Sequence, residues 1–340
     1  MSEKIILVTG GMGFIGSNFI KYLLSNYVDY VIVNADAITY AANSRNLKSI
    51  EKNPNYVFEQ IDIRDRELVN SLFNNYKFNY VIHFAAESHV DNSIINPTIF
   101  AETNILGTMN VLEAARTLWQ EKPFLYKEEF SNVRFHHIST DEVYGTLGKT
   151  GFFTEKTPYS PNSPYSASKA SSDMLVRSYY HTFGLNVVTT NCSNNYGPMQ
   201  HDEKLIPTII RNALMNKAIP IYGEGKNVRD WLYVEDHCQA IDKAFHHGKS
   251  GETYLIGGNN EKSNIEIAHI ICEYLDELHP GNKSYKNLIS YVTDRPGHDL
   301  RYAIDASKSR KELYFTPNET FETGILKTIN WYLKKYKSKG

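Results

Sequence analysis

The chain has 340 residues, of which 41% are hydrophobic and 22% are charged, and its formal net charge of −2 provides no basic field for nucleic acid or an anionic membrane. Its three cysteines, Cys192, Cys238 and Cys272, lie far apart without metal-ligand spacing, which argues against a disulfide framework and a zinc site. Residues 1–4 lack the pattern of a secretory leader, and no apolar run approaches the roughly 20 residues of a membrane span, so a cytoplasmic protein is expected.

Six short apolar runs in the first part of the chain are typical of strands. They lie at residues 4–9, 30–36, 56–62, 80–86, 134–140 and 186–191. Helical stretches lie between them, notably at residues 17–24, 101–119 and 165–182. Because strands alternate with helices, the sequence predicts an α/β fold with a doubly wound parallel sheet of the Rossmann type.

The pattern loosens after about residue 191. Prolines and glycines interrupt it from Pro198 onward, and we interpret this part as a smaller, mixed α/β lobe that covers the ligand. The predicted division is a dinucleotide-binding Rossmann domain at residues 1–190, to which a segment at about 228–256 returns, and a mainly substrate-binding lobe at 191–340. The lysine-rich end, residues 334–340, is expected to be frayed.

A glycine-rich turn joins the first predicted strand to the first helix. Gly10 permits the tight turn, Gly13 lets the backbone approach a pyrophosphate, and Gly16 lets the helix pack against the strand. The helix N-terminus would supply N–H donors and a positive dipole to the phosphates. A merely flexible turn is the alternative, but the position between a clear strand and a clear helix favours a dinucleotide site.

Asp36 ends the second predicted strand. A carboxylate there can accept hydrogen bonds from ribose hydroxyls and would repel a 2′-phosphate, so NAD is predicted rather than NADP. A plain strand-end cap is the alternative interpretation. Topology alone places two further stretches beside the cofactor: Asp62-Ile63 near the adenine, and Phe84-Ala85-Ala86 near the pyrophosphate and ribose.

Tyr165 and Lys169 stand one helical turn apart on the face of a predicted helix. An ammonium beside a phenol stabilises the phenolate and lowers its pKa from near 10, so that the tyrosine can act as a base. With 24 tyrosines in the chain, an isolated Tyr-x-x-x-Lys match would indicate a surface pair. Here the pair opens the helix after the fifth strand, in a chain with a dinucleotide motif, which favours a catalytic role.

Adjacent acids, Asp141 and Glu142, directly follow the strand at residues 134–140. Ligands bind outside the carboxyl ends of the strands in such sheets, and burying carboxylates is costly unless they are paired. The acids are therefore interpreted as functional, with a solvated turn capped by Asp141 as the alternative. Two histidine pairs, His136-His137 and His246-His247, are interpreted as core or surface residues, and no metal site is predicted.

Together these motifs resemble those of the extended short-chain dehydrogenase/reductases, and within them the branch that dehydrates nucleotide-activated hexoses. The matching stretches keep the family's order over nearly the whole chain: TGGMGFIGS (9–17), AAESHVDNSI (85–94), STDEVYG (139–145), YSASKASSD (165–173), NCSNNYGP (191–198), KLIP (204–207), PIYGEG (220–225), RDWLYVEDH (229–237) and DRPGHD (294–299). The Asp-Glu pair distinguishes this branch from related epimerases and decarboxylases. Residues 199–202 differ from the family pattern and are expected to carry little.

The resemblance implies NAD-dependent dehydration of dTDP-glucose to dTDP-4-keto-6-deoxyglucose in three steps. First, Tyr165 takes the 4-hydroxyl proton while hydride leaves C4 for NAD⁺; Thr140 bonds that hydroxyl, and Lys169 holds Tyr165 and the nicotinamide ribose. Next, Glu142 removes the C5 proton while Asp141 donates to the departing 6-hydroxyl. Finally, hydride returns to C6 and C5 is reprotonated. Different burial could separate the pKa values of the two acids.

The resemblance also implies which residues bind each ligand. For NAD they are Gly10, Gly13, Phe14, Ile15, Gly16, Asp36, Asp62, Ile63, Phe84, Ala85, Ala86, Ser88, Thr103, Tyr165, Lys169 and Asn195. For the sugar nucleotide they are Ser88, Thr140, Asn194, Glu203, Lys204, Pro220, Ile221, Tyr222, Arg229, Asn260, Asp294, Arg295 and His298. Arg229 and Arg295 are the expected diphosphate clamps, since a guanidinium matches phosphate geometry.

A homodimer is expected, because in this family the helices at 101–119 and 165–182 pair across a two-fold axis. Three other functions stay open at this point: a dehydratase for another nucleotide sugar, with a CDP- or GDP-linked substrate; a nucleotide-sugar 4-epimerase; and a non-catalytic dinucleotide sensor. An epimerase would need no acid–base pair after the fifth strand, and a sensor would need neither that pair nor Tyr165 with Lys169.

Overall fold

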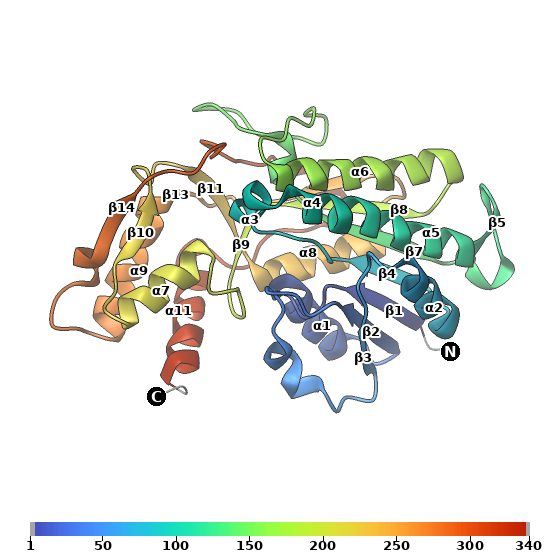
Figure 1. Ribbon diagram of the computed structural model, residues 1–340, viewed down its shortest axis with the longest axis horizontal. Coiled ribbons are helices and arrows are strands. Elements are labelled where there is room, and N and C mark those ends of the chain that lie inside the picture. Colours follow the sequence, from blue (N-terminus) through green and yellow to red (C-terminus); the bar gives the residue numbers. More distant parts are fainter. Residues whose placement is uncertain (1–3, 338–340) are drawn as a thin grey trace.

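A seven-stranded parallel sheet dominates the computed structural model, which describes residues 4–337 (Figure 1). Its strands are β1 (Lys4–Thr9), β2 (Tyr30–Asp36), β3 (Tyr56–Gln60), β4 (Tyr80–His83), β7 (Arg134–Thr140), β8 (Val187–Cys192) and β12 (Thr253–Ile256), in the order β12-β8-β7-β4-β1-β2-β3. The order reverses between β1 and β4, which is where sheets of this kind bind ligands. The predicted α/β class with a doubly wound parallel sheet is confirmed.

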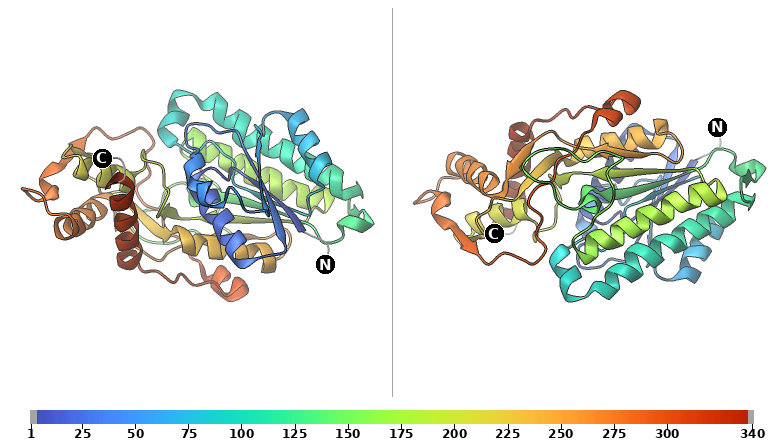
Figure 2. Two further views of the ribbon diagram at one scale, coloured as in Figure 1. Left: turned by 90° about the horizontal axis from the view of Figure 1, so that it is seen from below. Right: turned by 90° about the horizontal axis from the view of Figure 1, so that it is seen from above.

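Helices cover both faces of this sheet, because its strands are apolar on both sides (Figure 2). In β1, Leu7 packs in one core with side chains of α2 (Arg66–Tyr76), α5 (Thr108–Trp119) and α6 (Pro164–Phe183). Its neighbours Ile6 and Val8 pack in the other core with α1 (Phe14–Asn26) and α8 (Val234–His247). Successive strand residues point to opposite faces, so the side chains of one apolar run pack in two hydrophobic cores.

Two strands are shorter than predicted. β3 ends at Gln60 rather than at residue 62, and β4 ends at His83 rather than at 86. The chain turns out of the sheet at both places: Asp62 Oδ1 accepts a hydrogen bond from the Arg64 N–H at 2.9 Å, and Thr9 Oγ1 accepts one from the Ala85 N–H at 3.2 Å. Apolar character thus continues past the strand ends, into residues that line a cleft.

The predicted helix at 101–119 is divided. Two short helices, α3 (Val90–Ile95) and α4 (Pro97–Phe100), lead into a π-helical segment, η2 (Ala101–Gly107), and only then into α5. Gly107 lies so close to Ile63 that a Cβ would come within 2.7 Å of that side chain. The irregular turns therefore adjust the helix to the end of β3, an arrangement that helical periodicity cannot reveal.

Most elements of the second half of the chain form a smaller lobe at one end of the sheet (Figure 1). It contains β9 (Asn194–Tyr196), β11 (Val228–Tyr233) and β13 (Glu261–Ser263) in one sheet, and β10 (Ile219–Tyr222) paired with β14 (Ile289–Val292) in another. Helices α7 (Leu205–Leu214), α9 (Asn264–Leu278) and α11 (Phe321–Lys337) enclose its core, which includes Ile209, Ile271 and Ile325. By contrast, α8 and β12 leave this part of the chain and pack with the main sheet.

The last helix extends beyond the point where fraying was expected. α11 continues to Lys337, whereas residues 338–340 lie outside the described part of the chain. Lys335 lies over the rings of Trp331 and Tyr332 and forms a 2.8 Å ion pair with Asp202. Tertiary contacts of this kind hold the lysine-rich turn in place, and composition alone does not reveal them.

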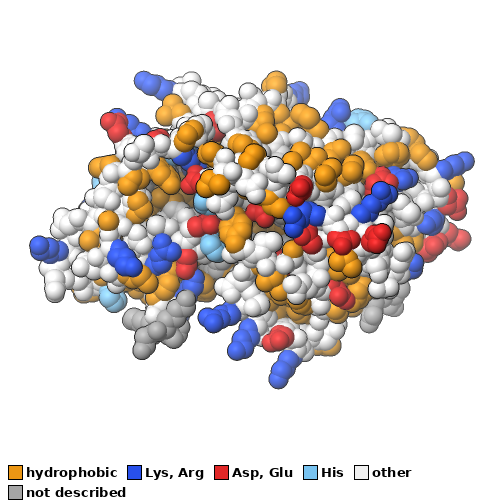
Figure 3. All heavy atoms as spheres, in the orientation of Figure 1, with side chains coloured by type: hydrophobic (Ala, Val, Ile, Leu, Met, Phe, Trp, Pro, Cys, Tyr) orange, Lys and Arg blue, Asp and Glu red, His pale blue; other side chains and the backbone are white. Residues whose placement is uncertain are grey.

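Charges of both signs share the surface. On the face in Figure 3, lysine and arginine side chains are interspersed with acidic, apolar and uncharged ones instead of gathering into one basic area. Within residues 4–337, no helix combines the length and apolarity needed to cross a membrane.

Candidate active site

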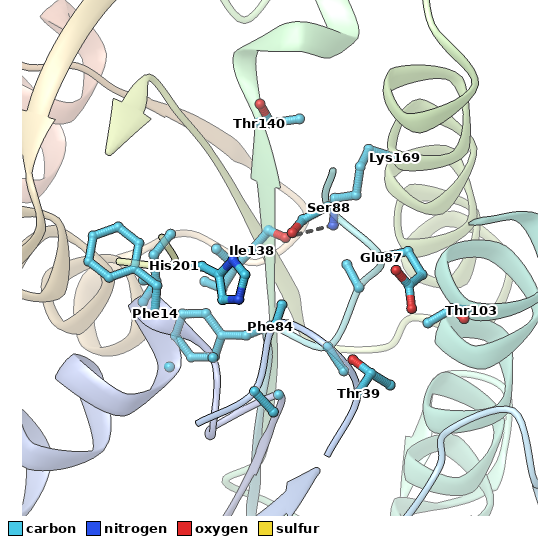
Figure 4. Close-up of a pocket in the computed structure, with 18 of the residues that line it drawn as sticks. Phe14, Thr39, Phe84, Glu87, Ser88, Thr103, Ile138, Thr140, Lys169 and His201 are labelled. Carbon is cyan, nitrogen blue, oxygen red and sulfur yellow. Dashed lines mark hydrogen bonds between the residues drawn. The ribbon is translucent and has the colours of Figure 1, made fainter. Parts of the chain in front are cut away.

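A large cleft opens at the carboxyl ends of the central strands, between the sheet and the smaller lobe (Figure 4). Its cavity volume is about 320 Å³, which lies within the roughly 300–1,000 Å³ of ligand pockets. Every residue predicted to bind NAD lines it, as do all five residues predicted to be catalytic and part of the predicted sugar-nucleotide set: Ser88, Thr140, Asn194, Glu203 and Lys204.

The glycine turn brings bare backbone to the floor of this cleft. Gly10 has φ of +72°, and a Cβ on it would meet the Ala85 nitrogen at 2.7 Å. A Cβ on Gly16 would meet the Gly10 oxygen at 2.5 Å. α1 begins at Phe14 with Gly13 as its N-cap, which provides no side-chain acceptor for the first N–H groups of the helix. These donors therefore suit the phosphates of a dinucleotide.

Asp36 lies at the carboxyl end of β2, on the wall of the same cleft. Its two carboxylate oxygens accept hydrogen bonds from the Met12 and Ile38 N–H groups, both at 2.8 Å. Burial raises its pKa, and these two hydrogen bonds oppose the rise. The side chain is thus a structural cap and also a fixed acceptor that two ribose hydroxyls can reach. Together with the glycine turn, it fits NAD.

The acid pair lies on one tight turn. β7 ends at Thr140, whose Oγ1 accepts from the Glu142 N–H at 3.3 Å and donates to Asp141 Oδ1 at 3.4 Å. Asp141 is 1% exposed, and its other oxygen, Oδ2, has no partner. A buried carboxyl oxygen without a partner at the wall of a cleft is suited to a substrate hydroxyl.

The surroundings of the two acids differ in charge. Burial raises the pKa of Asp141 well above its usual value; the nearby negative charges of Glu142 and Asp230 add to the rise, and the Arg229 cation opposes it. Burial also raises the pKa of Glu142, but the cations Arg295, Arg229 and Lys204 oppose it. Asp141 therefore keeps its proton more strongly than Glu142, which is the difference that an acid and a base in one site require.

Tyr165 and Lys169 open α6, whose start is fixed by a capping box of Ser163 and Ser166. Both side chains are buried, and the Lys169 ammonium donates to the Ile138 carbonyl oxygen at 2.9 Å (Figure 4). Burial raises the pKa of Tyr165 well above 10, and the charge of Glu142 adds to this. In the chain alone, desolvation therefore outweighs any lowering of this pKa by Lys169, whose ammonium bonds a carbonyl.

The other predicted sugar-nucleotide ligands lie in the smaller lobe, outside the residues that line the cleft. The Arg229 guanidinium stacks 4.1 Å from the centre of the Tyr302 ring and donates to the Asp299 carbonyl at 2.9 Å. Asn260 Nδ2 donates to the Gly258 carbonyl at 2.9 Å. These two side chains are thus held mainly by the backbone of their own lobe.

Arg295 is held differently, by the opposite side of the cleft. Its Nη1 donates to Asp91 Oδ1 of α3 at 3.1 Å, and Tyr222 donates to the other Asp91 oxygen at 3.3 Å. Within residues 4–337, Arg295 Nε is buried without a hydrogen-bond partner. Asp91 thus fixes one end of this guanidinium. Nearby, His298 Nδ1 lies 2.6 Å from Asp294 Oδ1. Pro220 and Ile221 directly precede Tyr222 on β10.

Sequence reasoning missed several residues of the site. Asp91 lies within a matching stretch, yet its contacts with Arg295 and Tyr222 join segments far apart in the chain. Gln200 and His201 were expected to carry little, but both line the cleft, and Figure 4 shows His201 on the same side as Phe14 and Phe84. Their position just after β9, at the entrance to the smaller lobe, was the available signal.

Comparison with known proteins places the chain among nucleotide-sugar dehydratases. The family model described as GDP-mannose 4,6 dehydratase matches residues 7–328. A curated relative, the dTDP-glucose 4,6-dehydratase of Neisseria meningitidis serogroup B, is 54% identical over 333 residues, which cover 96% of this chain and 93% of the relative.

Two solved structures are similar over almost their full length. The dTDP-glucose 4,6-dehydratase of Bacillus anthracis in complex with NAD has a TM-score of 0.86 and 46% identity, with 98% of each chain covered. The dTDP-glucose 4,6-dehydratase of Streptomyces venezuelae, with NAD and TYD bound, has a TM-score of 0.88 and 41% identity, also with 98% of each chain covered.

Proposed function

The chain belongs to the family of dTDP-glucose 4,6-dehydratases, and from this premise we propose how its own residues carry out NAD-dependent conversion of dTDP-glucose to dTDP-4-keto-6-deoxyglucose. The observation that carries the proposal is the single cleft in which Tyr165, Lys169 and the Asp141-Glu142 pair meet the glycine turn and Asp36. An epimerase has no use for the acid pair, and a dinucleotide sensor has no use for the pair or for Tyr165.

When bound, NAD supplies the acceptor and later the donor of the hydride. The chain's residues move the protons. Tyr165 takes the proton from the sugar 4-hydroxyl, with Thr140 bonded at the same oxygen. The resulting 4-ketone acidifies the C5 proton, which Glu142 removes, while Asp141 protonates the departing 6-hydroxyl and water is lost. Lys169 favours the phenolate of Tyr165 by its charge.

Incubation with nucleotide-linked glucoses tests this function. A 4-keto sugar product gives an alkali-induced absorbance, which we expect with dTDP-glucose and only weakly with the CDP-, GDP- and UDP-linked sugars. Formation of the nucleotide-linked galactose would instead indicate an epimerase. Absence of any product from all four substrates would favour the dinucleotide sensor.

Asp36 sets the cofactor preference in this proposal. Asp36→Arg replaces an acceptor for ribose hydroxyls by a cation that attracts a 2′-phosphate, so we expect the ratio of the dissociation constants for NADP and NAD to fall by at least about tenfold. Titration of the cofactor-free protein with each dinucleotide measures the ratio. Equal affinities of the wild type for both dinucleotides would contradict this role for Asp36.

Asp141 is proposed as the acid for the 6-hydroxyl. Asp141→Asn cannot donate this proton, and we expect dehydration of dTDP-glucose to slow by about 10²–10⁴-fold, the usual contribution of such a group. A 6-fluoro substrate carries a leaving group that needs no proton, so the same variant should lose far less activity with it. Equal slowing with both substrates would favour a purely structural cap.

We also propose that the protein is a homodimer that pairs through η2, α5 and α6. In support, Leu106 of η2 is 50% exposed and Met174 of α6 is 57% exposed, which is unusual for large apolar side chains on two packed helices. Light scattering at micromolar concentration is expected to give twice the mass of one chain. For Met174→Glu, the measured mass is expected to fall toward that of a single chain. A monomeric wild type would contradict the proposal.

Two further proposals concern organisation and compartment. We propose that residues 1–190 with about 228–256 serve NAD binding, and 191–340 mainly substrate binding, in support of which α8 and β12 pack with the main sheet. A reducing cytoplasm suits the three cysteines, which are all buried and free.

A further inference from the structure

A buried carboxylate, Asp173, lies one helical turn after the catalytic lysine. Asp173 follows Lys169 by one turn of α6, so both side chains are on one face of the helix. Asp173 is 4% exposed, as is Lys169. Neither the mechanism above nor the predicted site includes Asp173, yet a fully buried carboxylate is costly unless hydrogen bonds and an opposite charge compensate it.

Three side chains from three other segments surround this carboxylate. His137 Nε2 of β7 lies 3.1 Å from Asp173 Oδ1. The Tyr159 hydroxyl and Asn191 Nδ2 of β8 both donate to Oδ2 at 3.0 Å. Donors on both oxygens stabilise the charged form, and with Lys169 they keep the pKa of Asp173 below its usual value although burial opposes this.

The other titratable groups around this pair carry no compensating charge. Burial lowers the pKa of His83 and of His137, which disfavours a charge on either ring, although the Asp173 carboxylate opposes this for His137. Burial likewise raises the pKa of the Tyr144 hydroxyl and of the Cys192 thiol, so these groups keep their protons. Lys169, one turn before Asp173 on the same face of α6, is therefore the cation that acts on this carboxylate.

Lys169 needs such a partner. Burial lowers its pKa, and the Asp173 charge opposes this change. Its hydrogen bond to the Ile138 carbonyl satisfies a single donor of the ammonium. A neutral amine could still donate to that carbonyl, but it would no longer favour the phenolate of Tyr165.

Asp173 is also linked by hydrogen bonds, through one side chain, to the turn that carries Asp141 and Glu142. Asn191 Nδ2, which donates to Asp173, donates as well to the Thr140 carbonyl at 3.0 Å. Thr140 is the last residue of β7 and directly precedes the acid pair. The carboxylate thus orients the amide that ties β8 to the end of β7.

We propose that Asp173 is a positioning residue that holds Lys169 in its ammonium form and, through Asn191, fixes the end of β7 at the active site. It acts through these neighbours and does not touch the substrate. The inference deepens the proposed function, because it assigns the counter-charge that the lysine of that reaction requires.

The pH dependence of kcat/KM tests the proposal on the intact enzyme. Asp173→Asn removes the counter-charge, so the pKa of Lys169 should fall and the alkaline limb of the profile should move to lower pH by about one unit or more. Asp173→Glu keeps the charge and should leave that limb within a few tenths of a unit of the wild type, even if kcat is reduced. The matched control is Asp242→Asn. It removes a carboxylate of α8 that accepts hydrogen bonds from Tyr22 and Tyr27, and it should not move the alkaline limb of the profile.

A second readout does not depend on catalysis. Competitive acetylation, read by mass spectrometry across pH, reports the pKa of Lys169 because only the neutral amine reacts. We expect Lys169 to be mainly charged at pH 7 in the wild type and its pKa to fall by at least about one unit in Asp173→Asn. This measurement stays informative if the protein forms no 4-keto sugar, so failure of the proposed function and failure of this inference are distinguishable.

Two results would overturn the proposal. One is a folded Asp173→Asn variant, judged by thermal unfolding, whose alkaline limb and Lys169 pKa match the wild type. The other needs no variant: acetylation that shows Lys169 mainly as the neutral amine at pH 7 in the wild type would mean that Asp173 does not keep the lysine charged. The second test applies even if Asp173→Asn does not fold.

Discussion

Tyr165→Phe is expected to abolish sugar oxidation and dehydration together, with kcat reduced by about 10²–10⁴-fold. Phenylalanine fills the same buried space but cannot take the 4-hydroxyl proton, and every later step needs the 4-ketone. On mixing with dTDP-glucose, we therefore expect neither the absorbance of the reduced dinucleotide nor a 4-keto product. Stopped-flow absorbance and the alkali assay measure these two quantities.

The matched control for this variant is Tyr179→Phe, on the same helix. The Tyr179 hydroxyl donates to Glu113 of α5, away from the cleft, so its loss should leave kcat near the wild-type value.

The rate of oxidation should also depend on pH. Burial raises the pKa of Tyr165, so its phenolate is scarce near neutral pH and becomes more populated as pH rises. We therefore expect oxidation by the wild type to accelerate with pH on the acid side, and persistence of that slope in Tyr165→Phe would exclude tyrosine as its source.

Glu142→Gln is expected to separate the first step from the second. Glutamine cannot remove the C5 proton, so product formation should fall by about 10²–10⁴-fold while oxidation at C4 continues. Reduced dinucleotide should then accumulate on mixing with dTDP-glucose. In deuterated solvent, the wild type should place deuterium at C5 and the variant should not, which nuclear magnetic resonance of the recovered sugar measures.

Glu113→Gln serves as the control for this second variant. Glu113 lies on α5 in an ion pair with Arg116 at 2.9 Å, outside the cleft, and its loss should not affect deuterium exchange. If Glu142→Gln still exchanged C5 at the wild-type rate, a different residue would have to be the base. The cations that face Glu142 in the wild type would then serve only to bind the substrate.

Local patterns were enough to predict the central fold and the residues of the cleft. The strand at Lys4–Thr9 is apolar at every position that must fill a core, and its run ends at a turn in which Gly10 and Gly16 have no room for a Cβ. Asp36, Tyr165 and Lys169 were found in the same way. Parallel strands all end at one edge of a sheet, so short motifs after successive strands converge without any further information.

Tertiary structure decided what depends on distant neighbours and on exclusion of water. Nothing near Asp91 in the sequence indicates its bonds to Arg295 and Tyr222, and the family pattern around His201 gave no reason to place it at the cleft. Burial raises the pKa of Tyr165, whereas the spacing of Lys169 one turn away by itself predicts a fall. Spacing along a helix or strand is a local property that sequence determines by itself, whereas desolvation and the field of surrounding charges sum over the whole fold.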